Sequence, residues 1–271
     1  MPPTNDLILM KIGADPEALF WSRNEKTVIP AYQLCGGRSA CRSWIGTDGH
    51  ATTAELRPTP SKNVLMVLAD LASAMGVIEK NLNALNARTN LDLVVVAEPA
   101  FAGEPLGGHI HLSYWYEQTN PVLFRQGEHD FGHVYVYLHA FLSPLLSVAG
   151  GINRGEYTYR PQPLPSNKYP PRKNMLPARV EFRRPGTWLS SPVLAFTFLG
   201  LTKLAILNYP RLSGAESHKE YITFLRTLKT TSDLTTLVDT VDYVLANPPK
   251  WYQKTPALVD FAAWRDVLGE D

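Results

Sequence analysis

Polar and apolar residues alternate with a period of two in several short stretches of this chain, a pattern typical of half-buried strands. The alternation is strict over residues 107–113. His109 and His111 therefore share one face of a predicted strand, and apolar side chains share the other. Two imidazoles placed in this way reach a common ion, although a pair of hydrogen-bonded structural histidines gives the same pattern.

Three further predicted strands carry polar residues at alternate positions. They lie around residues 7–12, 52–57 and 178–184, and each meets a glycine or a proline. Pro16, which has no backbone N–H, favours an edge or bulged position for the first of them. The polar residues that alternate along these strands are Asp15 and Glu17, Glu55 and Arg57, and Arg179, Glu181 and Arg183.

Other elements follow from the same kind of pattern. Residues 18–30 predict a hairpin, and the continuous apolar run at residues 91–96 predicts a strand buried on both faces. Apolar residues at helical spacing predict a helix with Ser61 as its N-cap that ends at Gly76 or a few residues later. Two more long helices are predicted at residues 131–148 and 192–207.

The order of strands and helices is irregular, and the strands are polar on one face. This combination predicts an α+β fold, in which an antiparallel sheet has helices on one side and a polar site on the other. Residues 211–271 predict two or three amphipathic helices, with the clearest periodicity at residues 234–245. Residues 152–177 are rich in proline, basic residues and tyrosine without a period, and are too long for an ordinary connection, which predicts a functional loop.

Composition narrows the class of protein. The chain has 271 residues, a formal net charge of +1, 45% hydrophobic residues and 19% charged residues, so neither disorder nor a nucleic-acid or membrane-surface partner is favoured. It has no apolar run long enough to span a membrane and no signal peptide pattern at its first residues, and we expect a cytoplasmic protein. Cys35 and Cys41 are expected to be free thiols.

The four polar strand faces suggest one kind of chemistry if they meet. Carboxylates with one or two imidazoles suit Mg²⁺ or Mn²⁺, and arginines bind phosphates through planar bidentate contacts. The expected chemistry is phosphoryl transfer stabilised by metal ions and arginines. Each face taken alone is equally compatible with solvated surface. P-loop, Gly-x-Gly-x-x-Gly, Gly-x-Ser-x-Gly and His-Glu-x-x-His motifs are absent from the sequence.

Four sequence blocks together resemble a known family. They are Gly13-Ala-Asp-Pro-Glu17, Ala54-Glu-Leu-Arg-Pro58, Gly107-Gly-His-Ile-His111 and Arg179-Val-Glu-Phe-Arg183. In this order and spacing, over roughly residues 8–205, they resemble the carboxylate–amine ligases of type 2, phage-type amidoligases of the glutamine synthetase and glutamate–cysteine ligase superfamily. The resemblance implies a glutamine synthetase-like antiparallel sheet that forms an open cleft. There, ATP and two or more Mg²⁺ or Mn²⁺ ions activate a carboxylate as an acyl phosphate, which an amine attacks.

The resemblance also implies roles for individual residues. Arg183 and Arg179 would neutralise phosphate, and Arg57 would do the same or bind the substrate carboxylate, with Arg183, Arg57 and Glu55 as the catalytic group. From the residues themselves, His111 would orient His109 or complete the hydrogen bonding beneath it, and the sequence leaves open whether His111 is itself a ligand. The implied metal ligands are Asp15, Glu17, Glu55, His109 and Glu181. The implied nucleotide contacts are Arg179, Arg183, His109, Arg160 and Arg172, with Arg154 and Tyr157 as further loop candidates.

Two alternatives stay open from the sequence. A metallohydrolase would hold its ion with His109, His111 and an acid, and a non-catalytic phage structural or binding protein would keep only the fold. For the ligase, the expected partners are small-molecule or peptide carboxylates and amines, with no nucleic acid and no membrane. The expected organisation is a catalytic domain at residues 1–210 and a C-terminal helical extension at residues 211–271 that packs on the same domain. The sequence indicates neither the substrates nor the oligomeric state.

Overall fold

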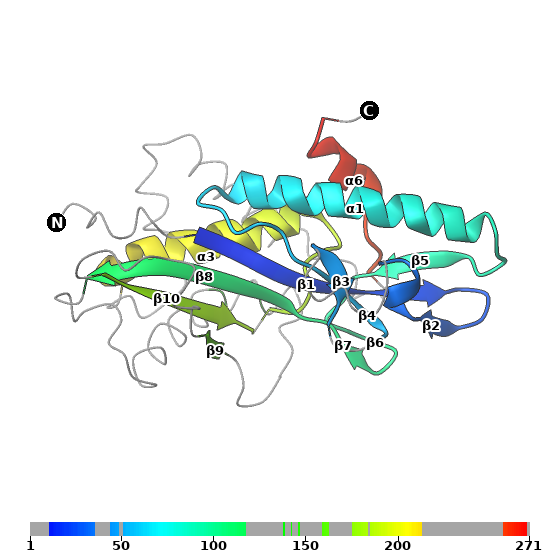
Figure 1. Cartoon of the computed structure of the whole chain (residues 1–271), viewed down its shortest axis with the longest axis horizontal. Coiled ribbons are helices and arrows are strands. Elements are labelled where there is room, and N and C mark those ends of the chain that lie inside the picture. The colour runs from blue at the N-terminus through cyan, green and yellow to red at the C-terminus, as the bar shows by residue number, and fades with distance from the viewer. Residues whose placement is uncertain are drawn as a thin grey trace.

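Strand β1 (Lys11–Ser22) organises the sheet (Figure 1). Its first half pairs antiparallel with β8 (Gly108–Glu117), and from Glu17 onwards it pairs with β4 (Thr53–Leu56). Its last residues pair with β2 (Thr27–Ile29) and β5 (Leu93–Val96). The computed structural model describes residues 11–35, 44–48, 51–117, 159–162, 175–183, 185–212 and 257–269, together with Leu138, Leu142 and Leu146.

Within these residues the main sheet has the order β3-β4-β1-β8-β10-β9, and β2 and β5 also pair with β1. The remaining strands are β3 (Ile45–Thr47), β9 (Tyr159–Gln162), β10 (Met175–Phe182) and a separate hairpin of β6 (Ala100–Phe101) with β7 (Glu104–Pro105). The helices are η2 (Ala31–Gln33), α1 (Val64–Asn86), α3 (Pro192–Leu212) and α6 (Phe261–Asp266).

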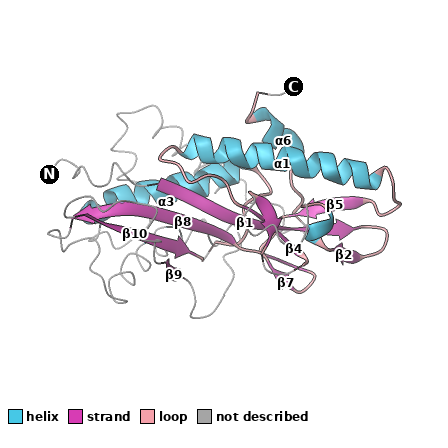
Figure 2. Cartoon of the chain, viewed as in Figure 1, coloured by secondary structure: helices cyan, strands magenta, loops and turns pink. Residues whose placement is uncertain are grey.

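The helices α1, α3 and α6 cover one face of the sheet (Figure 2). The apolar side chains of the alternating strands point to that side, where Ile12, Ile110 and Leu112 form one buried cluster with Leu71 of α1 and Phe198 of α3. Burial of such a face is the main favourable term in folding. The predicted α+β class, with an open, mostly antiparallel sheet and helices on one face, is confirmed.

Several predicted boundaries were wrong. β1 is one continuous central strand through Pro16, and not an edge strand. Pro16 is tolerated because pairing with β4 begins only at Glu17, so the missing N–H lies just before that ladder. Helix α1 is capped by Asn63, whose side chain accepts from Leu65 N at 3.0 Å, and not by Ser61. It also continues well past Gly76.

Four short strands lie in segments for which no strand was predicted. β3 falls in a glycine-rich region, the β6–β7 hairpin lies in the connection before β8, and β9 lies in the predicted loop at residues 152–177, where β10 also begins. Helix α3 extends beyond the predicted residue 207 to Leu212. Of the helix predicted at 131–148, the described Leu138, Leu142 and Leu146 are helical and buried.

The last described segment returns to the sheet. Ala97 N donates to Ala257 O at 2.9 Å and Val259 N donates to Val95 O at 3.0 Å, so the segment lies along β5 before it enters α6. Among the thiols, Cys35 is free and buried, as expected, and burial raises its pKa to about 12. Cys41 and the helix predicted at residues 234–245 lie outside the described residues.

Candidate functional site

The register of the strands brings the predicted polar residues onto one face of the sheet. Asp15 of β1 lies opposite His109 of β8, and Glu17 lies opposite Glu55 of β4. Glu181 of β10 lies opposite His111. Residues directly opposite each other in an antiparallel pair project to the same side, so the four strand faces meet as predicted.

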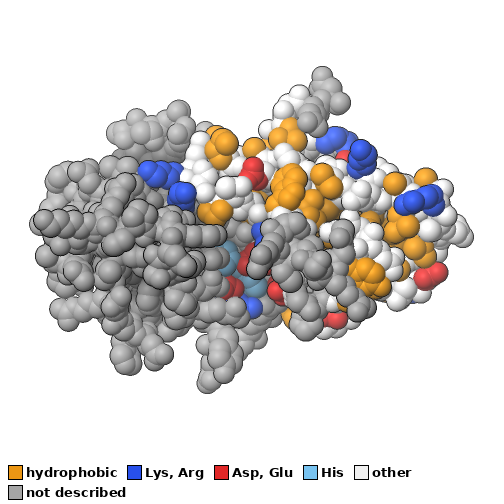
Figure 3. Space-filling model, in the orientation of Figure 1, with side chains coloured by type: hydrophobic (Ala, Val, Ile, Leu, Met, Phe, Trp, Pro, Cys, Tyr) orange, Lys and Arg blue, Asp and Glu red, His pale blue; other side chains and the backbone are white. Residues whose placement is uncertain are grey.

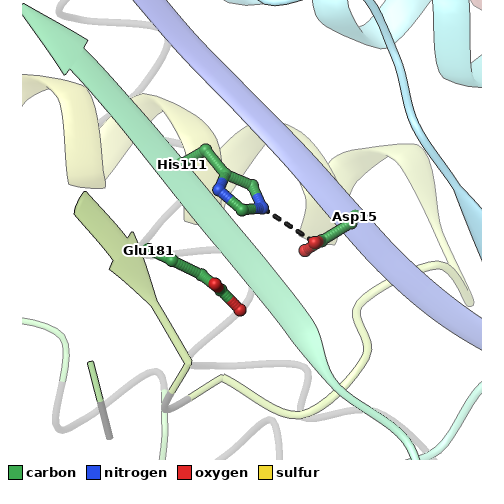
Figure 4. Close-up of side chains that lie close together, drawn as sticks. All are labelled: Asp15, His111 and Glu181. Atoms are coloured by element: carbon green, nitrogen blue, oxygen red, sulfur yellow. Dashed lines mark ion pairs between the residues drawn. The ribbon is translucent and has the colours of Figure 1, made fainter. Parts of the chain in front are cut away.

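Asp15, His111 and Glu181 form the centre of this face (Figure 4). Each offers one ligand atom within 4.8 Å of the others. His111 Nε2 lies 2.8 Å from Asp15 Oδ2. His109 Nδ1 approaches the same two acids, at 3.3 Å from Asp15 Oδ1 and 3.6 Å from Glu181 Oε1. Both imidazoles therefore contact the acid cluster, although only His109 was predicted to be a ligand.

The cluster is largely buried, and one of its carboxylate oxygens is unsatisfied among the described residues. Glu181 is only 3% exposed and both histidines are buried. Asp15 Oδ1 is buried without a hydrogen-bond donor among the described residues. A buried carboxylate oxygen of this kind normally has a partner, and a cation would supply one. Two carboxylates and an imidazole are a donor set that fits Mn²⁺ or Mg²⁺. Figure 3 shows acidic, basic and histidine side chains gathered near the middle of one view of the molecule.

A second acidic pair lies beside the first. Glu17 Oε2 accepts a hydrogen bond of 2.5 Å from the amide of Gly107, which links β1 to the residue just before β8. Glu55 is ion-paired with Arg57, whose Nη2 also donates to Thr47 O at 3.0 Å. The contact with Thr47 depends on β3, and nothing in the glycine-rich sequence around it indicated this role.

The charges of the site change the pKa values of its acids in opposite directions. Burial raises the pKa of Asp15, but the neighbouring imidazoles of His109 and His111 outweigh it and hold that pKa below its usual range. Burial and the negative charge of Asp15 raise the pKa of Glu55 to about 8, against the opposing charge of Arg57. Such crowding of carboxylates is typical of a site that binds a cation.

The metal-free protein should therefore lose stability as the pH rises towards about 8. Folded Glu55 keeps its proton up to about pH 8, whereas an unfolded glutamate ionises near 4.3, so the folded state binds the extra proton between these values. Glu55→Gln should remove this loss. The stability of the variant relative to wild type should therefore rise by at least about 1 kcal/mol as the pH is raised from about 5 to about 8. Urea unfolding with a chelator present measures the difference.

The exposed Glu25 provides the matched control for this experiment, because Glu25→Gln removes a carboxylate that is open to solvent. The stability difference of Glu55→Gln is read against that of this variant, measured at the same pH values. Parallel stability curves for wild type and Glu55→Gln over this range would show that the Glu55 prediction is wrong.

The predicted phosphate-binding arginines have different positions. Arg183 Nε lies 3.2 Å from Glu181 Oε1, and the side chain is 23% exposed, so it reaches the edge of the acid cluster. Arg179 lies opposite Ser113, and Arg160 of β9 lies opposite Glu181, which places both backbone positions on the site side of the sheet. Arg172, Arg154 and Tyr157 lie outside the described residues.

A comparison with protein families identifies one family that part of this chain matches. Residues 12–125 match the model of the "Phage phiEco32-like COOH.NH2 ligase-type 2" family. The resemblance to the phage COOH.NH2 ligases is confirmed. The match includes β1, β4, α1 and the start of β8 with its two histidines, and it ends before β10, short of the predicted limit at residue 205.

Solved structures extend the similarity in fold over nearly the whole chain. The complex between Prokaryotic Ubiquitin-like Protein Pup and its ligase PafA matches with a TM-score of 0.51 and 10% identity, over 98% of this chain and 64% of that chain. A bifunctional glutathione synthetase from Pasteurella multocida matches with a TM-score of 0.50 and 12% identity, over 97% of this chain and 49% of that chain. This chain thus spans about half to two thirds of their lengths. These identities establish similarity of fold alone.

Two further comparisons gave less. A novel glutamine synthase homolog matches at a TM-score of 0.42 with 17% identity, over 96% of this chain and 71% of that chain, and this score is too low to support an argument. No curated protein matches the chain.

Among the described residues, no helix is both long and apolar enough to cross a membrane.

Proposed function

We propose that this protein is an ATP-dependent carboxylate–amine ligase that forms an amide or peptide bond and releases ADP and phosphate. The observation that carries the proposal is the buried cluster of Asp15, His109, His111 and Glu181, in which Asp15 Oδ1 lacks a hydrogen-bond donor from the described residues. This cluster lies on a chain whose residues 12–125 match a ligase family. The proposed substrates are a small-molecule or peptide carboxylate and an amine.

Two or more Mg²⁺ or Mn²⁺ ions are proposed to bind the acids of the sheet face. When bound, they would neutralise the phosphate charge of ATP and the charge that develops during transfer. Glu181 and Asp15 supply carboxylate oxygens at one end, together with His109 Nδ1. Glu17 and Glu55, opposite each other on β1 and β4, supply a second pair.

The basic residues are proposed to bind the anionic groups of the substrates. Arg183 is partly exposed and ion-paired with Glu181, so its guanidinium is held at the rim of the cluster and can turn towards a phosphate. Arg179, Arg160 and Arg172 are proposed as further nucleotide contacts. Arg57 is held between Glu55 and Thr47 O, and is proposed to bind phosphate or the substrate carboxylate.

In the proposed reaction, a carboxylate oxygen of the substrate attacks the γ-phosphorus of ATP, the bond to the β–γ bridging oxygen breaks, and ADP leaves. The amine then attacks the carbonyl carbon of the acyl phosphate, loses a proton and displaces inorganic phosphate. The residues of this site contribute position and opposite charge, since phosphoryl transfer needs little covalent participation from the protein.

Glu181→Gln should weaken metal-dependent ATP binding by at least about 100-fold, because the change removes a charged oxygen from the acid cluster. Replacing a residue that only orients a metal ligand typically costs about 10–100-fold, and the loss of a ligand should cost more. Calorimetry with ATP and Mg²⁺ measures the affinity, and ADP release with pooled amino acids and peptides measures the reaction. Glu79→Gln is the matched control. Glu79 is on α1, paired with Arg265 on the helical side of the sheet, and its loss should leave nucleotide binding unchanged.

Two results would contradict the assignments. Unchanged nucleotide binding in Glu181→Gln would remove Glu181 from the ligand set. A folded wild-type protein that neither binds ATP with Mg²⁺ nor releases ADP would overturn the proposed function itself.

A metallohydrolase is the second candidate, because His111 Nε2 together with Asp15 and Glu181 is also a donor set for a tightly held ion. The two functions differ in how the metal is retained. A hydrolase centre should keep stoichiometric zinc through dialysis, whereas the ligase site should hold its ions weakly until nucleotide is present. Metal analysis of the dialysed protein separates the two functions.

A further inference from the structure

Gly107 occupies a critical position between two proposed metal ligands. Its amide donates to Glu17 Oε2 at 2.5 Å, and its carbonyl accepts from Glu17 N at 2.8 Å. A Cβ atom at residue 107 would overlap His109 Nε2, so the imidazole packs directly against the glycine backbone. The ring is thereby turned with Nδ1 towards Asp15 and Glu181. The position of this one peptide therefore sets the placement of both Glu17 and His109.

Residues 185–188, which follow β10, form hydrogen bonds with the residues on either side of Gly107. Thr187 N donates to Leu106 O at 3.0 Å, and Gly108 N donates to Pro185 O at 2.9 Å. Trp188 adds a side-chain hydrogen bond, from its indole Nε1 to Gly108 O at 3.0 Å. A Cβ atom at residue 108 would lie 2.5 Å from Trp188 Nε1, so the second glycine of the pair is what allows this approach.

Trp188 has little freedom to move. It is fully buried and belongs to the same core cluster as Phe198 and Leu199 of α3. Its hydrogen bond thus connects the rigid helical layer to the start of β8, where the site begins. Partners outside the ligand shell that orient a ligand in this way typically change metal affinity by about 10–100-fold when they are removed.

We propose that Trp188 is a positioning residue of the metal site, which holds the Gly107–Gly108 backbone so that Glu17 and His109 keep their ligand geometry. The proposal rests on the proposed function, because that function makes both Glu17 and His109 metal ligands. In this role Trp188 acts through the backbone of β8.

The test compares two tryptophans. Trp188→Phe removes the indole N–H and keeps an aromatic ring. Trp264→Phe does the same at an equally buried indole whose Nε1 donates to Leu189 O at 2.9 Å. Both variants should lose a similar amount of thermal stability. Only Trp188→Phe should lose affinity for Mn²⁺, measured by calorimetry or electron paramagnetic resonance with Mn²⁺ alone, by about 10-fold or more.

Gly107→Ala provides a second variant if Trp188→Phe does not fold. Its methyl group would displace the His109 ring, and it should weaken Mn²⁺ binding in the same way. Gly76→Ala in α1 is its control, since a Cβ there has nothing within 4 Å. Equal Mn²⁺ affinities in Trp188→Phe and wild type, or equal losses in both tryptophan variants, would overturn the positioning role alone. A wild-type protein that binds no Mn²⁺, either alone or with ATP, would overturn the metal site and this inference with it.

Discussion

Asp15→Asn is expected to abolish the proposed ligase activity, with a loss on the order of 10³-fold or more. Asp15 contacts both imidazoles of the cluster, at 2.8 Å from His111 Nε2 and 3.3 Å from His109 Nδ1, and its Oδ1 is the buried oxygen without a hydrogen-bond donor in the described part of the chain. A metal ion supplies several kcal/mol of transition-state stabilisation, and about 1.4 kcal/mol is a factor of ten in rate. The measurement is ADP release at saturating ATP and Mn²⁺.

The same variant has a pH-dependent effect on the metal-free protein. The two histidines hold the pKa of Asp15 below its unfolded value, so the ionised acid stabilises the fold above about pH 4 and this contribution is lost as the pH falls. Asp15→Asn should therefore destabilise the metal-free protein by about 1.5–3 kcal/mol at neutral pH, and by less in acid. Urea unfolding with a chelator at both pH values measures the difference.

Asp92→Asn is the control for both experiments. Asp92 is half exposed, lies 3.9 Å from Arg23, and has a positive φ of 47° that asparagine also tolerates. Its replacement should leave activity unchanged, and the stability of Asp15→Asn is compared with that of this variant at both pH values. If Asp15→Asn retains activity within about tenfold of this control, Asp15 is not a metal ligand, since loss of a ligand costs more than that.

The site face could be predicted because it depends on local periodicity. A period of two puts His109 and His111 on one side of a strand whatever its neighbours are, and the apolar side has to be buried against something. Glu181 and Asp15 follow the same rule on their own strands. The sequence therefore indicated which residues share a face.

The pairing of these residues across strands could not be derived in the same way. That Glu17 lies opposite Glu55, and Asp15 opposite His109, depends on register between strands far apart in the chain. A shift of one residue would have turned one set to the helical side. Only the family resemblance, carried by four blocks in order, indicated that they meet.

The errors have physical causes in particular elements. The strands β3, β6 and β7 are two or three residues long, and so short a segment carries no period. Gly76 did not end α1, because packing of the buried positions Met75, Ile78 and Leu82 extends the helix beyond it. Pro16 did not place β1 at an edge, because one missing donor is tolerated where a ladder starts.

Trp264→Ala is expected to destabilise the whole described fold by about 3–5 kcal/mol. Trp264 of α6 is 1% exposed, its Nε1 donates to Leu189 O at 2.9 Å, and it belongs to the core cluster shared by α1 and α3. Because that cluster is continuous, we expect unfolding to remain a single transition that moves to a lower urea concentration. Urea unfolding followed by far-ultraviolet circular dichroism measures the shift without depending on tryptophan fluorescence.

This prediction bears on the proposal that residues 211–271 are an extension packed on the catalytic domain. Val267→Ala, at a position that is 38% exposed, is the control and should cost less than about 1 kcal/mol. If the C-terminal segment folded as an independent unit, Trp264→Ala would produce a separate early transition and leave the main one in place. A shift of the main transition instead means that the cavity left by Trp264→Ala destabilises the sheet as well. The segment that carries Trp264 also pairs with β5 through Ala257 and Val259, which connects the two.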